Sequence, residues 1–145
     1  MNLNHLYEIE PYSLNKEHKL KHLNSCFYNL TQYHYNNCIQ YRKIIKSLNF
    51  NIEIKYNYSE IPFLPVRLFK MFDLYSTSKE NIVKTMTSSG TTGQKVSKIF
   101  LDKETSLNQT KVLTKIVSNY LGSKRTPLLI IDSETVLKNR NMFSA

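Results

Sequence analysis

The sequence predicts an α/β fold with N-terminal helices, a strand pair joined by a glycine loop, and a βαβ unit. Three observations support this prediction. Apolar residues recur every three or four positions over most of the first 50 residues, two short alternating segments flank a glycine-containing loop at 88–93, and an amphipathic segment leads to an apolar run at 128–131. With 145 residues, 41% hydrophobic and 21% charged, the chain is long enough for one domain with a sizeable core.

Two consecutive helices are expected near the N-terminus. The first, over 16–35, follows Pro11-Tyr12-Ser13, and its apolar stripe is Leu20, Leu23, Phe27, Leu30 and His34. A break at Asn36-Asn37 separates it from a second stripe, formed by Cys38, Tyr41, Ile44, Ile45 and Leu48. These residues predict a helical part over 13–50.

An extended linker is expected over 51–80. Residues 49–59 are polar and aromatic without a clear period, which indicates a loop. Pro62 and Pro65 predict an extended segment, because each proline also moves its predecessor out of the α region. The apolar residues around them, including Phe63, are expected to pack against the core.

The last part, over 81–145, carries the predicted strands and the loop. Residues 81–87 and 96–101 form the strand pair, and Asp102 is positioned to cap a helix that stops at Gly122. The apolar face of that helix is Leu107, Val112, Leu113, Ile116, Val117, Tyr120 and Leu121. Residues 128–131 are apolar throughout, as in a strand buried inside an α/β sheet, and complete the βαβ unit.

The charge favours an anionic partner without specifying one. A net charge of +9 and a pI near 9.5 suggest nucleic acid, a membrane surface or an anionic ligand. The basic residues are scattered and no nucleic-acid recognition motif is present, so we expect no nucleic-acid partner. No apolar run reaches the roughly 20 residues of a membrane span and no signal segment is visible, which predicts a cytoplasmic protein without a span.

The cysteines and histidines predict no disulfide and no metal site. Cys26 and Cys38 would lie roughly 18 Å apart along a helix axis, beyond disulfide reach, so both are expected as free thiols. His18 and His22 have the i, i+4 spacing of metal ligands, but neither a third ligand nor a glutamate base accompanies them.

The loop is the strongest functional signal. Two of the three glycines of the chain, Gly90 and Gly93, stand among hydroxyl residues. Glycine lets the backbone approach a ligand closely, and neutral amide and hydroxyl donors suit an anion. The candidate phosphate-binding residues are Ser88, Ser89, Gly90, Thr91, Thr92 and Gly93. A plain hairpin turn explains the loop equally well, and neither the common P-loop nor the Rossmann fingerprint fits it.

The loop resembles the phosphate loop of the adenylate-forming superfamily, in which the pattern continues with x-Pro-Lys-Gly. Residues 94–97 lack that continuation, as does a narrower branch, the LuxE-type acyl-protein synthetases. Residues 8–14, 34–42, 61–70 and 127–132 also resemble landmarks of this branch, in the same order. One departure is Ile39, where the branch has proline after the cysteine.

The resemblance implies that the chain is an N-terminal portion of an adenylate-forming enzyme large domain. Such an enzyme activates a fatty acid with Mg²⁺-ATP to an acyl-adenylate and passes the acyl group to a protein thiol that serves an acyl-CoA-reductase-like partner. Residues 88–93 would hold the β- and γ-phosphates, and Mg²⁺ would be bound through ATP. The ribose, hinge and acyl-accepting residues are expected beyond Ala145, so the chain alone should be inactive. The alternative is a non-catalytic basic interaction module in which the loop is a turn.

Overall fold

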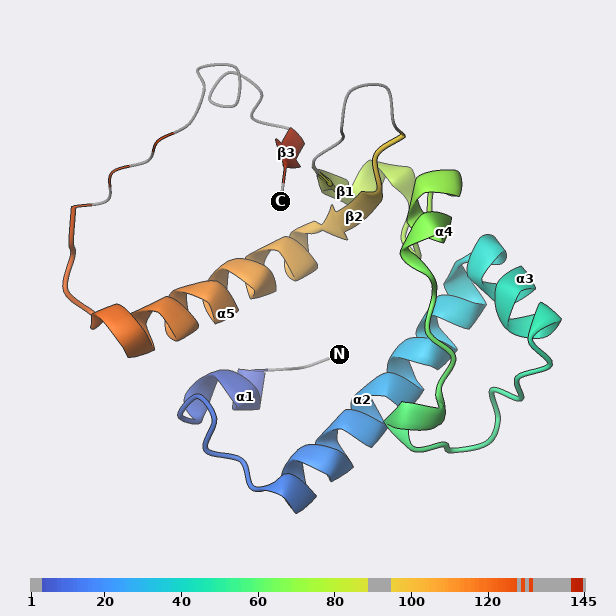
Figure 1. Cartoon of the computed structure of the whole chain (residues 1–145), viewed down its shortest axis with the longest axis horizontal. Helices are drawn as coiled ribbons and strands as arrows, with labels where there is room; N and C mark the ends of the chain where they lie inside the picture. The colour runs from blue at the N-terminus through green and yellow to red at the C-terminus, as the bar shows by residue number, and fades with distance from the viewer. Residues whose placement is uncertain (1–3, 89–94, 128, 130, 132–141, 145) are drawn as a thin grey trace.

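The computed structural model describes residues 4–88, 95–127, 129, 131 and 142–144. Two long helices, α2, Lys16–Asn37, and α5, Lys103–Leu121, dominate the described part, as Figure 1 shows. The short helix α3, Ile39–Ser47, packs against α2, whereas α4, Val66–Met71, contacts the sheet. The sheet and the N-terminal helix α1, Asn4–Glu8, lie with α5. The architecture mixes helices with one small sheet, in agreement with the predicted α/β class.

The first two predicted helices are confirmed as α2, Lys16–Asn37, and α3, Ile39–Ser47. The Asn15 side chain caps α2 by accepting the His18 N–H at 2.8 Å. Cys38 is the joint between the helices: its N–H donates to the His34 carbonyl at 2.8 Å, and its Sγ accepts the Tyr41 N–H at 3.5 Å. The break therefore falls one residue after the predicted Asn36-Asn37.

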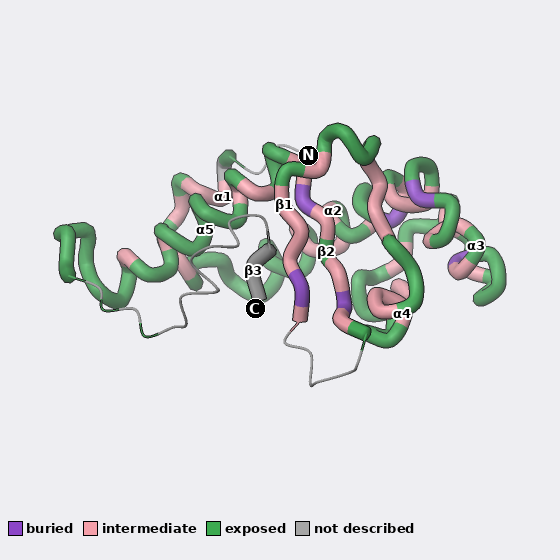
Figure 2. Tube along the Cα trace, turned by 90° about the horizontal axis from the view of Figure 1, so that it is seen from above, coloured by how far each residue is buried: buried purple, intermediate pink, exposed green. Residues whose placement is uncertain are grey.

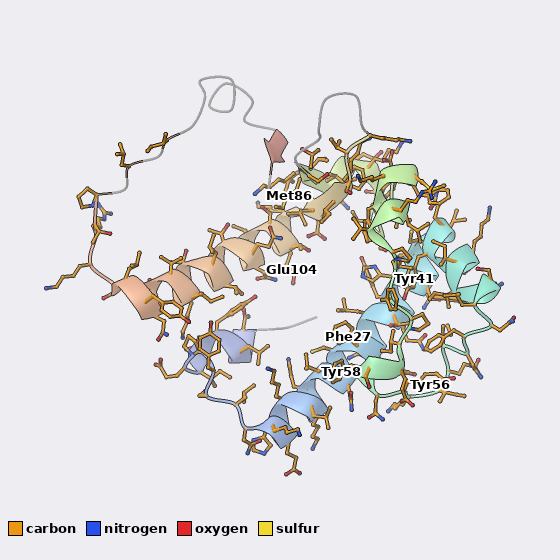
Figure 3. The ribbon with its side chains drawn as sticks, viewed as in Figure 1. Phe27, Tyr41, Tyr56, Tyr58, Met86 and Glu104 are labelled. Carbon is orange, nitrogen blue, oxygen red and sulfur yellow. The ribbon has the colours of Figure 1, made fainter. Side chains whose placement is uncertain are left out.

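The segment after α3 returns along α2. It is a loop, as predicted, and ends in a short 3₁₀ helix, η1, Tyr58–Glu60. The Asn24 side chain accepts the Tyr58 N–H at 2.8 Å, and Phe27 stacks on Tyr58 with ring centroids 6.1 Å apart (Figure 3). The Gln32 side chain donates to the Ile52 carbonyl and adds a second attachment to α2.

The extended segment predicted around the two prolines needs a correction. Residues Val66–Met71 form a helix, α4, with Pro65 at its N-cap, and Phe63 is 84% exposed instead of packed in the core. Proline restricts its own φ and the residue before it, but leaves the residues after it free to become helical. A second 3₁₀ turn, η2, Lys79–Asn81, then leads into the sheet.

The sheet has three strands in the order β2-β1-β3. Strands β1, Ile82–Thr87, and β2, Lys98–Asp102, are antiparallel and confirm the predicted strand pair. Their register shifts between Ile82 and Lys84, which marks a bulge. Strand β3, Met142–Ser144, pairs in parallel with the second half of β1.

Helix α5, Lys103–Leu121, confirms both predicted ends. Asp102 accepts the Thr105 N–H at 2.8 Å, and the helix stops at Gly122, whose φ of 79° is costly for other residues. Hydrogen bonds from the backbone and then the side chain of Thr105 lower the pKa of Asp102. These ends depend on local chemistry, which sequence reveals directly.

The strand predicted at 128–131 is not found at the residues that the structure describes there. Leu129 and Ile131 have no regular secondary structure and are 86% and 91% exposed, while Leu128 and Ile130 lie outside the described residues. The described strand after α5 is β3, which runs antiparallel to β2, so these strands make no parallel βαβ unit. An apolar run becomes a strand only beside a partner strand, and β1 already pairs with β2 on one side and β3 on the other.

The buried core of the described residues is small and divided. Its apolar members are Cys38 and Ile45 beside the α2–α3 joint, and Leu101 in the sheet (Figure 2). A sizeable core is therefore not found among the residues that the structure describes.

The predicted apolar face of α5 is exposed along its whole length. Its opposite, polar side faces α1, where the Lys115 ammonium donates to the Tyr7 carbonyl. This contact places Lys115 on the side of α5 that meets the N-terminal segment. Among the described residues, no helix combines the length and apolar character needed to cross a membrane.

Candidate functional site

The candidate site is the connection between β1 and β2, and a pair of serines closes its base. The Ser88 N–H donates to the Ser97 carbonyl at 3.1 Å, and the Ser97 N–H donates to Ser88 Oγ at 3.0 Å. This pair lies directly beyond the last bridge of the ladder, Thr87 to Lys98. Both ends of the connection are therefore held together by the sheet and by two hydrogen bonds.

Of the six predicted phosphate-binding residues, only Ser88 is among the described residues. Its Oγ accepts the Ser97 N–H, which leaves the hydroxyl proton available as a donor. Ser89, Gly90, Thr91, Thr92 and Gly93 lie outside the described residues, so their function stays a prediction. The following strand confirms that the connection is a strand-to-strand loop and does not open into a helix as a P-loop does.

Ser97 is a residue that sequence reasoning missed. It is 9% exposed, and its Oγ is buried without a hydrogen-bond partner among the described residues. A buried hydroxyl that lacks a partner costs about 1–3 kcal/mol. Its position at the base of a loop rich in hydroxyls suits a donor to an oxyanion. The signal that could have found it was its position immediately before β2, within residues 94–97, which lack the x-Pro-Lys-Gly continuation.

Two cations border the base of the loop. Lys95 is exposed, and the Lys98 ammonium lies 3.4 Å from Asp73 Oδ1. Because both members of this ion pair are solvent-exposed, the pair contributes little stability and leaves Lys98 accessible to a second anion. The local charge is compatible with a phosphate group.

The segment before β1 fastens the sheet to α2. Tyr75 packs edge-on against Phe100 of β2, with ring centroids 5.5 Å apart. The next residue, Ser76, receives the Tyr33 hydroxyl on its carbonyl at 3.0 Å, and its Oγ lies 2.7 Å from His34 Nδ1. Burial lowers the pKa of His34, which favours the neutral imidazole at this contact.

Neither cysteine is placed at the loop, and both are free thiols, as predicted. Cys38 is buried at the α2–α3 joint, and Cys26 Sγ lies 3.2 Å from His22 Nε2 on α2. Burial raises the pKa of Cys26, which disfavours its nucleophilic thiolate. Within the described ranges, no three His, Cys, Asp or Glu side chains gather in a way that suits a metal ion.

A family model described as acyl-protein synthetase, LuxE, matches residues 3–144. The chain belongs to the LuxE family. The match covers nearly the whole sequence, including the loop and all described helices and strands. Membership of the LuxE family implies acyl-protein synthetase activity in general terms. Comparison with curated proteins and with solved structures gave no match.

Proposed function

We propose that this LuxE-family chain serves the ATP-dependent activation of a long-chain fatty acid. The observation that carries the proposal is the family match over residues 3–144, which includes a hydroxyl-rich glycine loop closed at its base by Ser88 and Ser97. In the proposed reaction a carboxylate oxygen forms a bond to the α-phosphorus of ATP. The bond to the bridging oxygen breaks, and pyrophosphate leaves with the electron pair.

The contribution of this chain would be to hold the leaving phosphates. Residues 88–93 would supply hydroxyl and amide donors. The Ser97 hydroxyl, which has no partner among the described residues, supports an additional contact at the base of the loop. Donors that are already oriented stabilise the charge that develops on the leaving group. Mg²⁺ would enter with ATP, because this ion is bound mainly through phosphates and water.

The second step would transfer the acyl group to a thiol, with release of AMP. We place that thiol outside this chain, because Cys38 is buried in a structural joint and Cys26 has a raised pKa. An acyl-CoA-reductase-like protein is the proposed recipient. We also propose that the chain alone does not turn over, since its residues include no assigned ribose-binding or acyl-accepting group.

Nucleotide titration of loop variants tests the proposal. Thr91→Val and Thr92→Val keep the shape of each side chain and remove its hydroxyl. Because a hydrogen bond to a charged group contributes about 1.5–3 kcal/mol, ATP affinity should fall on the order of tenfold or more for at least one variant. Thr126→Val, which changes an exposed threonine outside the loop, should leave it unchanged.

The same titration separates the enzyme from the alternative, a basic interaction module. If both loop variants bind ATP as the wild type does, the loop is a turn and the proposed phosphate contacts are wrong. Pyrophosphate exchange with ATP and a fatty acid then tests turnover. Pyrophosphate exchange by the 145-residue chain alone would contradict the proposal that this chain does not turn over by itself.

A further inference from the structure

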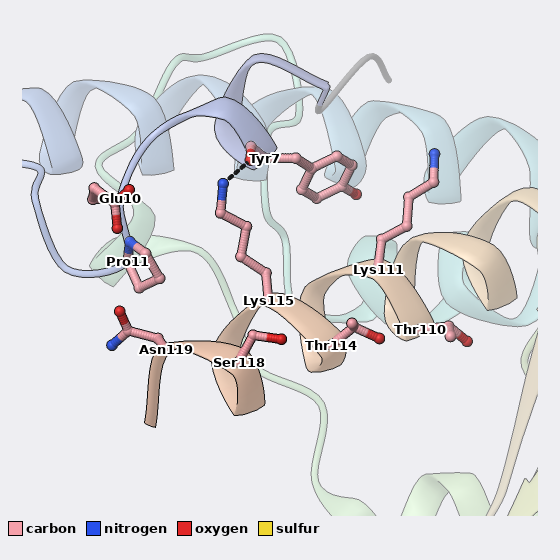
Figure 4. Close-up of a pocket in the computed structure, with 9 residues that line it drawn as sticks. All are labelled: Tyr7, Glu10, Pro11, Thr110, Lys111, Thr114, Lys115, Ser118 and Asn119. Carbon is pink, nitrogen blue, oxygen red and sulfur yellow. Dashed lines mark hydrogen bonds between the residues drawn. The ribbon is translucent and has the colours of Figure 1, made fainter. Parts of the chain in front are cut away.

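A cavity of about 620 Å³ lies between the N-terminal segment and the polar side of α5 (Figure 4). Tyr7, Glu10 and Pro11 line one wall, and Lys111, Lys115 and Ser118 are among the α5 residues of the other. Among the described residues of 88–97, which are Ser88 and 95–97, none lines this cavity, so it is separate from the base of the proposed nucleotide loop. Its size is in the range that small-molecule ligands occupy.

Two lysines on the same side of α5 face this cavity. Lys111 and Lys115 are four residues apart, a spacing at which like charges repel each other on a helix. Lys115 donates to the Tyr7 carbonyl, and the Lys111 ammonium lies 5.9 Å from the centre of the Tyr7 ring. The N-terminal segment is therefore held against α5 by the two lysines.

The positive charge of these lysines is not matched by an acidic partner within the described part of the chain. The ion pair found there joins Lys98 to Asp73, and Glu10 lines the cavity without forming an ion pair with either lysine. A lysine ammonium has three donors, so Lys115 retains donors beyond its bond to Tyr7. Two ammonium groups therefore line the same cavity, with Tyr7 between them (Figure 4).

Hydroxyl groups complete the set of donors. The Tyr7 hydroxyl is buried and has no hydrogen-bond partner among the described residues. Figure 4 shows the Tyr7 ring extending from its backbone along α5 toward Lys111. Thr114 and Ser118 line the same cavity, and each can donate a hydroxyl proton. Cationic and neutral donors therefore line one space, and the Tyr7 hydroxyl lacks a partner within the described part of the chain.

We propose that this cavity binds a small oxyanion, the phosphate or carboxylate group of a small molecule. Lys111, on the ring side of Tyr7, supplies the direct attraction, the Tyr7 hydroxyl supplies a directed hydrogen bond, and Lys115 adds positive charge at the other end of the cavity. Glu10 opposes a second negative charge at its end of the cavity, which favours a ligand with a single anionic group. The proposal does not rest on the function of the glycine loop.

The test is a nuclear magnetic resonance titration of the whole chain with inorganic phosphate and, separately, with acetate, at constant ionic strength set by chloride. We expect saturable shifts of the Tyr7 and Ser118 amides, and the two arms show which oxyanion binds more tightly. Shifts confined to the loop, or no saturable shifts with either anion, would overturn the proposal.

Two variants with a matched control make the test specific. Lys111→Gln should weaken oxyanion binding at least fivefold, whereas Lys103→Gln, which removes the same charge from α5 outside the cavity, should change it less than twofold. Equal effects would mean that only the net charge matters, which contradicts a site. Tyr7→Phe keeps the ring and its contact with Lys111, so the helices stay together. It should weaken binding at least threefold, and unchanged binding would overturn the assignment of this hydroxyl.

Loop variants distinguish this site from the proposed nucleotide site. Thr91→Val and Thr92→Val should leave the shifts at Tyr7 and Ser118 unchanged, whatever they do to ATP affinity. If they abolish these shifts, the response comes from the loop and the cavity is not an independent oxyanion site.

Discussion

The Arg42 guanidinium donates from Nε to the Tyr35 carbonyl at 2.8 Å and so closes the C-terminal end of α2 from the following helix. Its Nη2 donates to the Asn36 carbonyl at 2.6 Å, and the guanidinium lies 5.6 Å from the centre of the Tyr35 ring. The last carbonyls of a helix have no partner within the helix, and a glycine often allows the chain to supply one. Here an arginine on the next helix supplies it.

Removing this arginine should destabilise the helical part of the chain. We expect Arg42→Ala to lower the free energy of unfolding by about 1–3 kcal/mol, because two carbonyls lose a charged donor. Arg42→Lys should recover only part of the loss, since lysine cannot bond both carbonyls with a planar fork. Urea unfolding followed by circular dichroism measures both, and Lys43→Ala at an exposed neighbour is the control. Equal midpoints for Arg42→Ala and Lys43→Ala would contradict the structural function of Arg42.

The contact between His34 and Ser76 predicts a dependence of stability on pH. Burial lowers the pKa of His34 in the folded chain below its unfolded value of about 6.5. The unfolded chain then binds more protons in the window between the two values, so stability is complete above about pH 6.5 and falls as the pH drops toward the lowered pKa. His34→Gln should flatten this part of the profile. The measurement is the urea midpoint at pH 7.5 and at pH 5.5, and an unchanged slope in the variant would show that another group titrates.

Asp102 should contribute to stability mainly as a helix cap. Asp102→Ala removes the acceptor of the Thr105 N–H, and we expect a loss of about 1 kcal/mol. Asp102→Asn keeps an acceptor at the same position and removes the charge, so it should lose only a few tenths of a kcal/mol of helix-dipole stabilisation. Thermal or urea unfolding of the three proteins at pH 7 provides the comparison. A loss as large for Asn as for Ala would assign the effect to charge instead of capping.

Ser97 offers a test in which stability and nucleotide affinity change in opposite directions. Ser97→Ala removes a buried hydroxyl that has no partner among the described residues, so the free energy of unfolding without nucleotide should stay the same or rise by about 1 kcal/mol. ATP affinity should fall if this hydroxyl contacts a phosphate. Ser88→Ala, by contrast, removes the acceptor of the Ser97 N–H and should lower stability as well. Calorimetric titration and urea unfolding of both variants decide the matter, and unchanged ATP affinity in Ser97→Ala would exclude it from the site.

Features set by neighbouring residues could be predicted from the sequence. The stripes of α2 and α3, the Asp102 cap and the Gly122 stop all depend on interactions within one or two turns. The prolines predict extended backbone and so hide the α4 helix, although Pro65 restricts only its own φ and the residue before it.

Features that depend on distant residues could not be predicted. The exposure of Leu129 and Ile131 and the pairing of β3 with β1 depend on which strand reaches the sheet edge. Likewise, the contact of Lys115 with Tyr7 joins residues that are 108 positions apart, so no local pattern predicts it. A pattern of residue types also does not reveal that the hydroxyls of Tyr7 and Ser97 lack a hydrogen-bond partner among the described residues.

The separation of the buried residues into two places has a consequence for how the chain melts. Cys38 and Ile45 stabilise the part of the chain that contains α2 and α3, and Leu101 stabilises the part that contains the sheet. Near the sheet, polar contacts connect these two parts: Ser76 contacts Tyr33 and His34 of α2. Groups joined in this way exchange little apolar contact energy, so either can open while the other stays folded. A single melting temperature is then an average over two transitions, and a substitution in α2 should move one of them and leave the other in place.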